Sequence, residues 1–237
     1  MSLFGLIRIL NLKRISTLPP GKKKILWTIE YYVDQMKRLG VEIQLCKRVV
    51  LEDILDASPD ILIIATGSSP LKPPFSVKGI PLFTADEILS SPQAVKIGEV
   101  AIIGGGTTGC ETALTLDQRG FHVALFERLA EIATDAEPIT AWDLKDRVVK
   151  SDIVTNLNCT VTGIHASGLK VDRGGKRTST APFDLIVWAT GRFPNRSLAD
   201  EVNRSRFSGQ VHVIGDSASV GRIHDAVYQA YDVVKDL

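Results

Sequence analysis

A glycine-rich run near the middle of this chain has the residue types and spacing to bind a phosphate-bearing ligand. Residues 104–109, GGGTTG, fit the pattern G-x-G-x-x-G directly after the apolar run 100–103. The pattern also opens a predicted helix that ends near Gly120. Such a loop lets a pyrophosphate lie against bare backbone, and the first N–H groups of the helix receive its charge. The six candidate ligand-binding residues are Gly104, Gly105, Gly106, Thr107, Thr108 and Gly109.

An acidic residue ends the next predicted strand, residues 122–127. Glu127 lies close to the spacing of about 20 residues at which a carboxylate binds the adenosine ribose of a dinucleotide. Its charge would repel a 2′-phosphate, so the sequence favours NAD(H). The neighbouring Arg128 could accommodate that phosphate, so NADP(H) stays open as the alternative ligand. A glycine turn that binds no ligand is the remaining interpretation.

An internal repeat gives a second set of candidates. The segment 60–70, DILIIATGSSP, is echoed by 184–194, DLIVWATGRFP, with Asp, Ala, Thr, Gly and Pro at the same offsets. Each copy predicts a buried strand that breaks at a glycine, where a ligand can approach the backbone closely. The candidate residues in the two turns are Thr66, Gly67, Thr190 and Gly191.

Gly215 ends another apolar run, residues 211–215, and Asp216 follows it. The Asp216 carboxylate could contact the ribitol of a nucleotide or cap the helix that begins near Gly221, and the sequence leaves both roles open. No catalytic side chain is assigned, because the four histidines show no spacing to each other or to a nucleophile. Glu111 lies in the first turn of the glycine-loop helix, where a carboxylate is simply favourable.

Composition excludes several classes of function. With 28 basic and 27 acidic residues, the chain has no net field that would attract nucleic acid or an anionic membrane. No apolar stretch approaches the roughly 20 residues that span a bilayer. Three cysteines, Cys46, Cys110 and Cys159, lack the spacing of a metal or disulfide redox site. We therefore expect no metal, and small buried or half-buried thiols in the reducing cytoplasm.

Strands that alternate with helices position these residues, which predicts an α/β fold with a Rossmann-like unit. Strands are expected at 41–45, 61–65, 100–104, 122–127, 185–189 and 211–215. Helices are expected between Gly21 and Gly40, after the capping box 84–87, at 108–119, from Pro138, and around 223–234. Short strands around Gly174-Gly175 indicate a β-meander over 152–182.

Together these motifs resemble the flavoprotein pyridine nucleotide reductases, which have interleaved FAD and NAD(P) domains. They are most similar to the C-terminal portion of the NADH:flavin oxidoreductase family, which includes 2,4-dienoyl-CoA reductase and trimethylamine dehydrogenase. The similar segments are the PPGK turn and helix (19–40), ATGSSP (65–70), GGGTTGCETA (104–113), ATGRFPN (189–195) and GDSASVGRIHDAVYQAY (215–231).

The resemblance implies an NAD(P)-binding Rossmann-like domain over 98–192, inserted in a partial FAD/ADP-binding-type domain formed by 1–97 and 193–237. It implies that the glycine loop binds NAD(P)H, that both ATG turns line the FAD or ADP side and the domain hinge, and that Asp216 contacts FAD. A second G-x-G-x-x-G, the FAD fingerprint of the family, is absent ahead of the PPGK segment. The flavin-bearing barrel and its iron–sulfur cysteines are absent too. We therefore expect this chain to bind NAD(H), with NADP(H) possible, and to bind FAD weakly or not at all.

Two functions follow as hypotheses. The first is a nicotinamide-dinucleotide-binding fragment of a flavin-dependent oxidoreductase, which positions NADH for hydride transfer to a flavin on the flavin-bearing domain of its parent protein or complex. The alternative is a non-catalytic module that holds a dinucleotide or ADP within a larger redox protein. A Rossmann dehydrogenase with its own catalytic side chains is disfavoured, because the sequence shows no proton-transfer pair.

Overall fold

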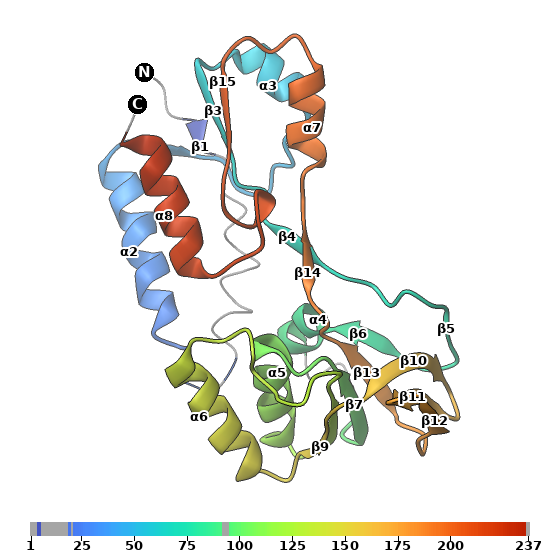
Figure 1. The fold of residues 1–237 in the computed structure, drawn as a ribbon. Helices are drawn as coiled ribbons and strands as arrows, with labels where there is room; N and C mark the ends of the chain where they lie inside the picture. Colours follow the sequence, from blue (N-terminus) through green and yellow to red (C-terminus); the bar gives the residue numbers. More distant parts are fainter. Residues whose placement is uncertain (1–3, 6–18, 20, 92–94, 236–237) are drawn as a thin grey trace. The chain divides into compact units, whose positions relative to one another are not determined.

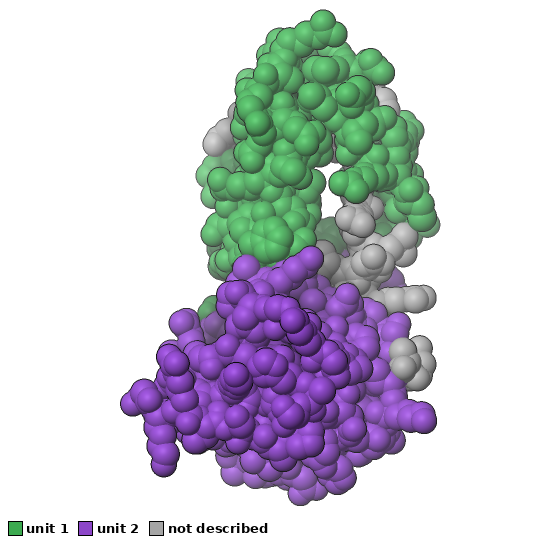
Figure 2. All heavy atoms as spheres, turned by 90° about the vertical axis from the view of Figure 1, so that its right-hand side faces the viewer, with its two compact units in different colours: residues 1–9, 32–69, 192–237 green, residues 10–31, 70–191 purple. Residues whose placement is uncertain are grey.

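A computed structural model describes residues 4–5, 19, 21–91 and 95–235 of the chain. They divide into two compact units, each built from separate stretches of sequence (Figure 2). Unit 1 takes the described residues of Met1–Ile9, Tyr32–Ser69 and Arg192–Leu237, and unit 2 those of Leu10–Tyr31 and Pro70–Gly191. Pro20 of the predicted PPGK turn lies outside the described residues.

A parallel sheet of five strands forms the centre of unit 2, in the order β6-β13-β7-β8-β9. Parallel strands are covered on both faces, which explains why the apolar runs 100–103 and 185–188 are entirely buried. The five strands are β6 (Leu82–Thr84), β13 (Leu185–Trp188), β7 (Glu99–Ile103), β8 (His122–Phe126) and β9 (Val154–Asn156).

Helices cover one face of this sheet and a second sheet covers the other (Figure 1). Successive residues of β7 point to opposite faces: Val100 and Ile102 pack with the helices, while Ala101 and Ile103 pack with the second sheet. The helices are α4 (Ala85–Ser90), α5 (Thr107–Asp117) and α6 (Pro138–Val149). The second sheet has the order β12-β11-β10-β5, from β12 (Lys176–Ser179), β11 (Gly168–Arg173), β10 (Thr160–His165) and β5 (Val77–Lys78).

Unit 1 has a smaller core between a strand pair and two helices. Ile54 of α3 (Leu51–Ala57) and Ala199 and Val202 of α7 (Ser197–Arg204) pack on Ile64 of β3. The strand pairs are β15 (Gln210–Val213) with β3 (Ile61–Ile64), β14 (Arg192–Pro194) with β4 (Ser68–Pro70), and β1 (Phe4–Gly5) with β2 (Glu42–Ile43). The remaining elements are α2 (Ile25–Arg38), the 3₁₀ turn η2 (Gly215–Ser217) and α8 (Ile223–Val234).

The predicted α/β class is confirmed, and one expectation about the buried strands needs correction. The strand at 61–65 was expected to be covered on both faces, but Ile63 is 40% exposed, because the core of unit 1 packs on the face of β3 that carries Leu62 and Ile64. The NAD(P)-binding domain expected over 98–192 stays a prediction, and the chain returns to unit 2 already at Pro70. The reason is that β6 pairs with β13, and α4 contributes Ile88 and Leu89 to the core of unit 2.

Candidate functional site

The glycine loop connects β7 to α5, as the sequence predicts, and two of its glycines are required by close packing. Gly104 has a φ of 106°, and a Cβ there would overlap the carbonyl of Ala189. A Cβ on Gly109 would overlap the carbonyl oxygen of Gly104. These two positions therefore allow the first turn of α5 to lie directly on the end of β7.

Gly106 differs from Gly104 and Gly109, because its bare face points to a side chain and not to backbone. Its φ of −67° is an ordinary one, and it is the N-cap residue of α5. A Cβ on Gly106 would lie 3.1 Å from Oδ2 of Asp135. Oδ1 of Asp135 accepts hydrogen bonds from the backbone N–H of Thr107 at 2.8 Å and from its hydroxyl at 3.0 Å. Sequence analysis missed Asp135, since it lies in the loop between β8 and α6 with no motif of its own.

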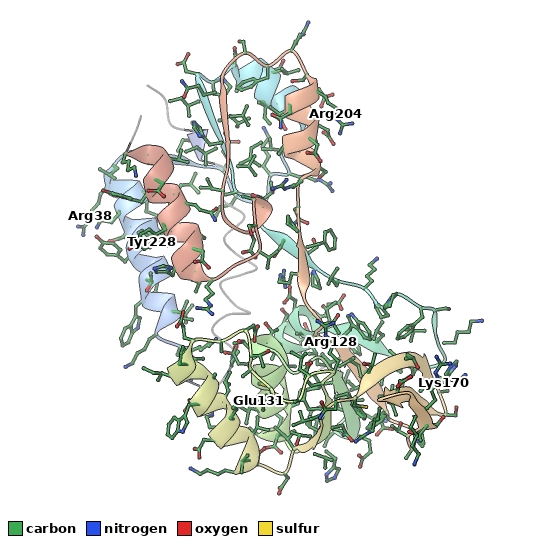
Figure 3. The ribbon with its side chains drawn as sticks, in the orientation of Figure 1. Arg38, Arg128, Glu131, Lys170, Arg204 and Tyr228 are labelled. Atoms are coloured by element: carbon green, nitrogen blue, oxygen red, sulfur yellow. The ribbon has the colours of Figure 1, made fainter. Side chains whose placement is uncertain are left out.

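Glu127 lies at the end of β8 with only 8% of its surface exposed. Its Oε2 accepts the N–H of Gly105 at 2.6 Å, and its Oε1 accepts the N–H of Leu129 at 2.8 Å. A carboxylate offers about four acceptor positions, so each oxygen retains a lone pair for a further donor. The adjacent Arg128 is exposed, and Figure 3 labels it on the segment that follows β8.

The carbonyl of Gly105 is also held from the segment after β8. It accepts the N–H of Ala133 at 2.7 Å and the thiol of Cys110 at 3.3 Å. Cys110 is fully buried, and this burial raises the pKa of its thiol to about 12. The thiol is therefore a neutral hydrogen-bond donor that supports the loop, and it is not a nucleophile at neutral pH.

The second ATG turn lies beside the glycine loop. The N–H of Ala189 donates to the carbonyl of Ile103 at 2.8 Å, and the Cα of Thr190 would be 3.1 Å from a Cβ on Gly104. Gly191 follows with a φ of 130°. Thr190 thus belongs to the same end of the parallel sheet as the glycine loop, where ligands bind in open α/β folds.

The first ATG turn lies in unit 1, where Asn195 holds it. The Thr66 hydroxyl donates to the carbonyl of Asn195 at 2.6 Å, and the N–H of Asn195 donates to the carbonyl of Gly67 at 2.9 Å. The strands that follow the two ATG turns, β4 and β14, pair with each other (Figure 1). Asn195 thus connects the end of one copy of the repeat to the turn of the other.

Asp216 is bound on both of its carboxylate oxygens within unit 1. Oδ2 accepts the Ser68 hydroxyl at 2.6 Å, and Oδ1 accepts the N–H of Gly221 at 3.1 Å. Gly221 precedes α8, and the capping interaction at the start of that helix belongs to Asp225, which accepts the N–H of Arg222 at 2.8 Å. Asp216 therefore binds the segment just before α8, and the bond to the N-cap residue of the helix comes from Asp225. Gly215, beside it, donates its N–H to the side chain of Gln229 at 2.7 Å.

Unit 2 also contains a pocket of about 340 Å³ next to α5 and α6. Glu111, in the first turn of α5, forms an ion pair there with Lys22. The pocket is lined by Pro19, Gly21, Lys22, Glu111, Thr140, Asp143, Leu144 and Arg147. The described residues hold no group of three or more His, Cys, Asp or Glu side chains arranged for a metal ion. None of the described helices has the length and apolar character to cross a membrane.

This geometry agrees with comparisons to known proteins. Residues 26–234 match the family model for pyridine nucleotide-disulphide oxidoreductases. The chain belongs to this family. It is 34% identical over 228 residues to an NADH oxidase of Thermoanaerobacter brockii, a match that covers 92% of this chain and 34% of the oxidase. It is 29% identical over 225 residues to a bilirubin reductase of Mediterraneibacter gnavus, covering 93% of this chain and 34% of that protein.

Solved structures share the fold over nearly the whole chain. A 2-naphthoyl-CoA reductase complex superposes with a TM-score of 0.81 at 25% identity, over 93% of this chain and 33% of its own. Histamine dehydrogenase from Rhizobium sp. 4-9 gives a TM-score of 0.83 at 19% identity, over 95% of this chain and 38% of its own. This chain of the pyridine nucleotide-disulphide oxidoreductase family therefore spans about a third of the length of these relatives.

Proposed function

We propose that this chain is the nicotinamide-dinucleotide-binding portion of a flavin-dependent oxidoreductase of the NADH:flavin oxidoreductase type. The relatives support the reaction class, since they include an NADH oxidase and a bilirubin reductase. One observation of the site carries the proposal: Glu127 at the end of β8 binds the N–H of Gly105 in the loop that opens α5. The glycine loop and the start of α5 form the arrangement that binds the pyrophosphate of a dinucleotide, and Glu127 has the place of the acidic residue that binds its adenosine ribose.

Each candidate residue then has a defined role. The pyrophosphate lies over Gly106 and accepts N–H groups of the first turn of α5, those of Thr107 and Thr108. The adenosine ribose donates its hydroxyls to the free lone pairs of Glu127. Since the carboxylate is buried and cannot move away from a 2′-phosphate, NAD(H) is preferred over NADP(H). Arg128 is exposed and is not needed for NAD(H).

The residues present do not fit FAD on this chain alone. Asp216, the candidate for the flavin side, retains a lone pair on each oxygen beside its bonds to Ser68 and Gly221, so the misfit lies at the pyrophosphate. The sequence has a single G-x-G-x-x-G, at 104–109 in unit 2, so no second glycine loop is present for the FAD pyrophosphate. In this proposal the flavin, which accepts the hydride, belongs to a flavin-bearing domain of the parent protein or complex. The buried free thiols Cys110 and Cys159 support a reducing cytoplasmic location.

Titration calorimetry with NADH and with ADP-ribose tests this function against that of a module that only holds an ADP group. A chain that positions the nicotinamide ring contacts it, so NADH should bind more tightly than ADP-ribose, with one site per chain. Equal affinities for the two ligands would favour the non-catalytic module. Absence of binding to both would contradict the proposal.

A further inference from the structure

We propose that Asp135 is a placeholder for the dinucleotide: in the free chain its carboxylate occupies the position of the pyrophosphate, and it must leave before a dinucleotide binds. The inference rests on the proposed function, because it concerns the same glycine loop. It assigns to Asp135 a role in setting the affinity of that loop for anionic ligands.

The position of the carboxylate is defined from two directions. Its Oδ1 lies 2.8 Å from the N–H nitrogen of Thr107, the first residue of α5. Both of its oxygens lie over the bare face of Gly106, at 3.1 and 3.3 Å from where a Cβ would be. A pyrophosphate at a loop of this kind uses the same N–H groups and the same open glycine face. The carboxylate and the pyrophosphate therefore compete for one volume and one set of donors.

Charge makes this competition strict. A dinucleotide pyrophosphate carries two negative charges, and at contact distance a third one on Asp135 repels both. The positive end of the α5 dipole and the Thr107 N–H favour one anion at this position, whichever group supplies it. Asp135 satisfies them in the free chain, since the N-cap residue Gly106 has no side chain to do so.

The surrounding segment is fixed, so the change can be confined to the Asp135 side chain. Ile132 and Ala133 are buried, and the N–H of Ala133 donates to the carbonyl of Gly105 at 2.7 Å. The N–H of Ala136 donates back to the carbonyl of Ala133 at 3.2 Å. Asp135 itself is exposed. Rotation of its side chain toward solvent therefore frees the Thr107 N–H while the hydrogen bond between Ala133 and Gly105 stays in place.

While the Asp135 carboxylate occupies the loop, no ligand binds there. The apparent affinity for every ligand is therefore its intrinsic affinity multiplied by the fraction of chains in which the Asp135 side chain has rotated away. A ligand that also binds Glu127 through a ribose starts from a higher intrinsic affinity than a bare phosphate or pyrophosphate, so it still binds measurably after this reduction. Because the reduction is the same factor for every ligand, it leaves the ratio of affinities unchanged and keeps the weaker inorganic anions off the start of α5.

Calorimetric titrations of NADH and of inorganic pyrophosphate into the full chain test the proposal with three variants. Asp135→Ala removes the competing group, and Asp135→Asn removes its charge. Glu131→Gln, in the same segment, removes one charge from a side chain that is exposed and pairs with Lys145, away from the loop (Figure 3). Thermal unfolding is followed in parallel, because loss of the cap on α5 should lower the stability of the free Asp135→Ala protein.

The expected result is that Asp135→Ala binds NADH about tenfold more tightly than the wild type while unfolding at a lower temperature. Asp135→Asn should bind NADH with intermediate affinity, pyrophosphate binding should become measurable in Asp135→Ala, and Glu131→Gln should match the wild type. NADH affinity that is unchanged or lower in both Asp135 variants, while the wild type binds NADH, would overturn the placeholder alone. No NADH binding by the wild type or any variant would overturn the proposed function and this inference together.

Discussion

The carboxylate of Glu127 accepts the backbone N–H of Gly105 at 2.6 Å, so the residue expected to bind the ribose also shapes the loop expected to bind the pyrophosphate. Its other oxygen accepts the N–H of Leu129 at 2.8 Å, which fixes the start of the segment after β8. A substitution that truncates Glu127 would therefore change loop geometry and ligand contacts at once. The isosteric Glu127→Gln separates these effects best, because it preserves volume and one acceptor oxygen.

We expect the wild type to bind NADH about tenfold or more tightly than NADPH, since a hydrogen bond to a charged group is worth about 1.5–3 kcal/mol. Glu127→Gln should narrow this gap by weakening NADH, and should also lower the unfolding temperature. Paired titrations of both cofactors measure the ratio, with the exposed Arg128→Gln as the control that leaves NADH affinity unchanged. A wild type that prefers NADPH would show that Arg128 governs the site.

The buried thiol of Cys110 predicts a dependence of stability on alkaline pH. Burial raises its pKa from 9.0 to about 12, so between these values the unfolded chain loses the proton and the folded chain keeps it. The free energy of unfolding should therefore fall as pH rises above 9, by up to about 1.4 kcal/mol per pH unit from this group. Urea unfolding at pH 8 and at pH 10 measures the change.

Cys110→Ala is the matched variant, and its loss of stability between the two pH values should be smaller than that of the wild type. An equal loss in both proteins would contradict the assignment.

In the native wild type at pH 8, the exposed Cys46 should react with iodoacetamide and Cys110 should not.

The interactions of Asp216 predict a structural effect without an effect on the dinucleotide. Asp216→Asn weakens the hydrogen bonds to Ser68 and Gly221 and should destabilise the chain by about 1–2 kcal/mol. The affinity of Asp216→Asn for NADH should equal that of the wild type.

The purified wild type should be colourless, with weak or no binding of added FAD. Visible-range absorbance and an FAD titration measure the flavin content and the FAD affinity. Stoichiometric flavin in the wild type would show that this chain suffices to hold it.

Local patterns predicted the elements that position the glycine loop. The buried strands β7 and β13 are uninterrupted apolar runs, and the capping box at Thr84 is present, with the N–H of Glu87 donating to the Thr84 hydroxyl oxygen at 3.2 Å. The helices α3 and α7 were missed, because they are short, with seven and eight residues. Their apolar residues form a helix face only once β3 and β15 are in place beneath them.

The non-local parts of the site could not be read from the sequence. Asp135 reaches Thr107 across 28 positions, and its role depends on the path of the loop between β8 and α6. That path includes Ala133 with a left-handed φ of 55°, a conformation that nothing in its residue type announces. Glu127 was predicted as a ribose ligand from its spacing, whereas its hydrogen bond to Gly105 depends on how the glycine loop folds back onto the end of β8.

Gly106 offers the cleanest test of the loop, because substitution there blocks the ligand face and disturbs the free chain only through the Asp135 cap. Its φ is accessible to any residue, and a Cβ would meet only the flexible end of Asp135. By contrast, a side chain on Gly109 would collide with the backbone of Gly104 and disturb the fold itself. A loss of binding in a Gly106 variant that remains folded therefore reports on the site.

The most direct measurement is the rise in unfolding temperature that NADH produces in the wild type and in Gly106→Val. Our account predicts that NADH at about 100 times its Kd stabilises the wild type by about 2.7 kcal/mol. It also predicts that Gly106→Val, which unfolds at a somewhat lower temperature without ligand because its side chain displaces the Asp135 cap, gains nothing from NADH. An equal rise in both proteins would contradict the assignment of the dinucleotide to this loop.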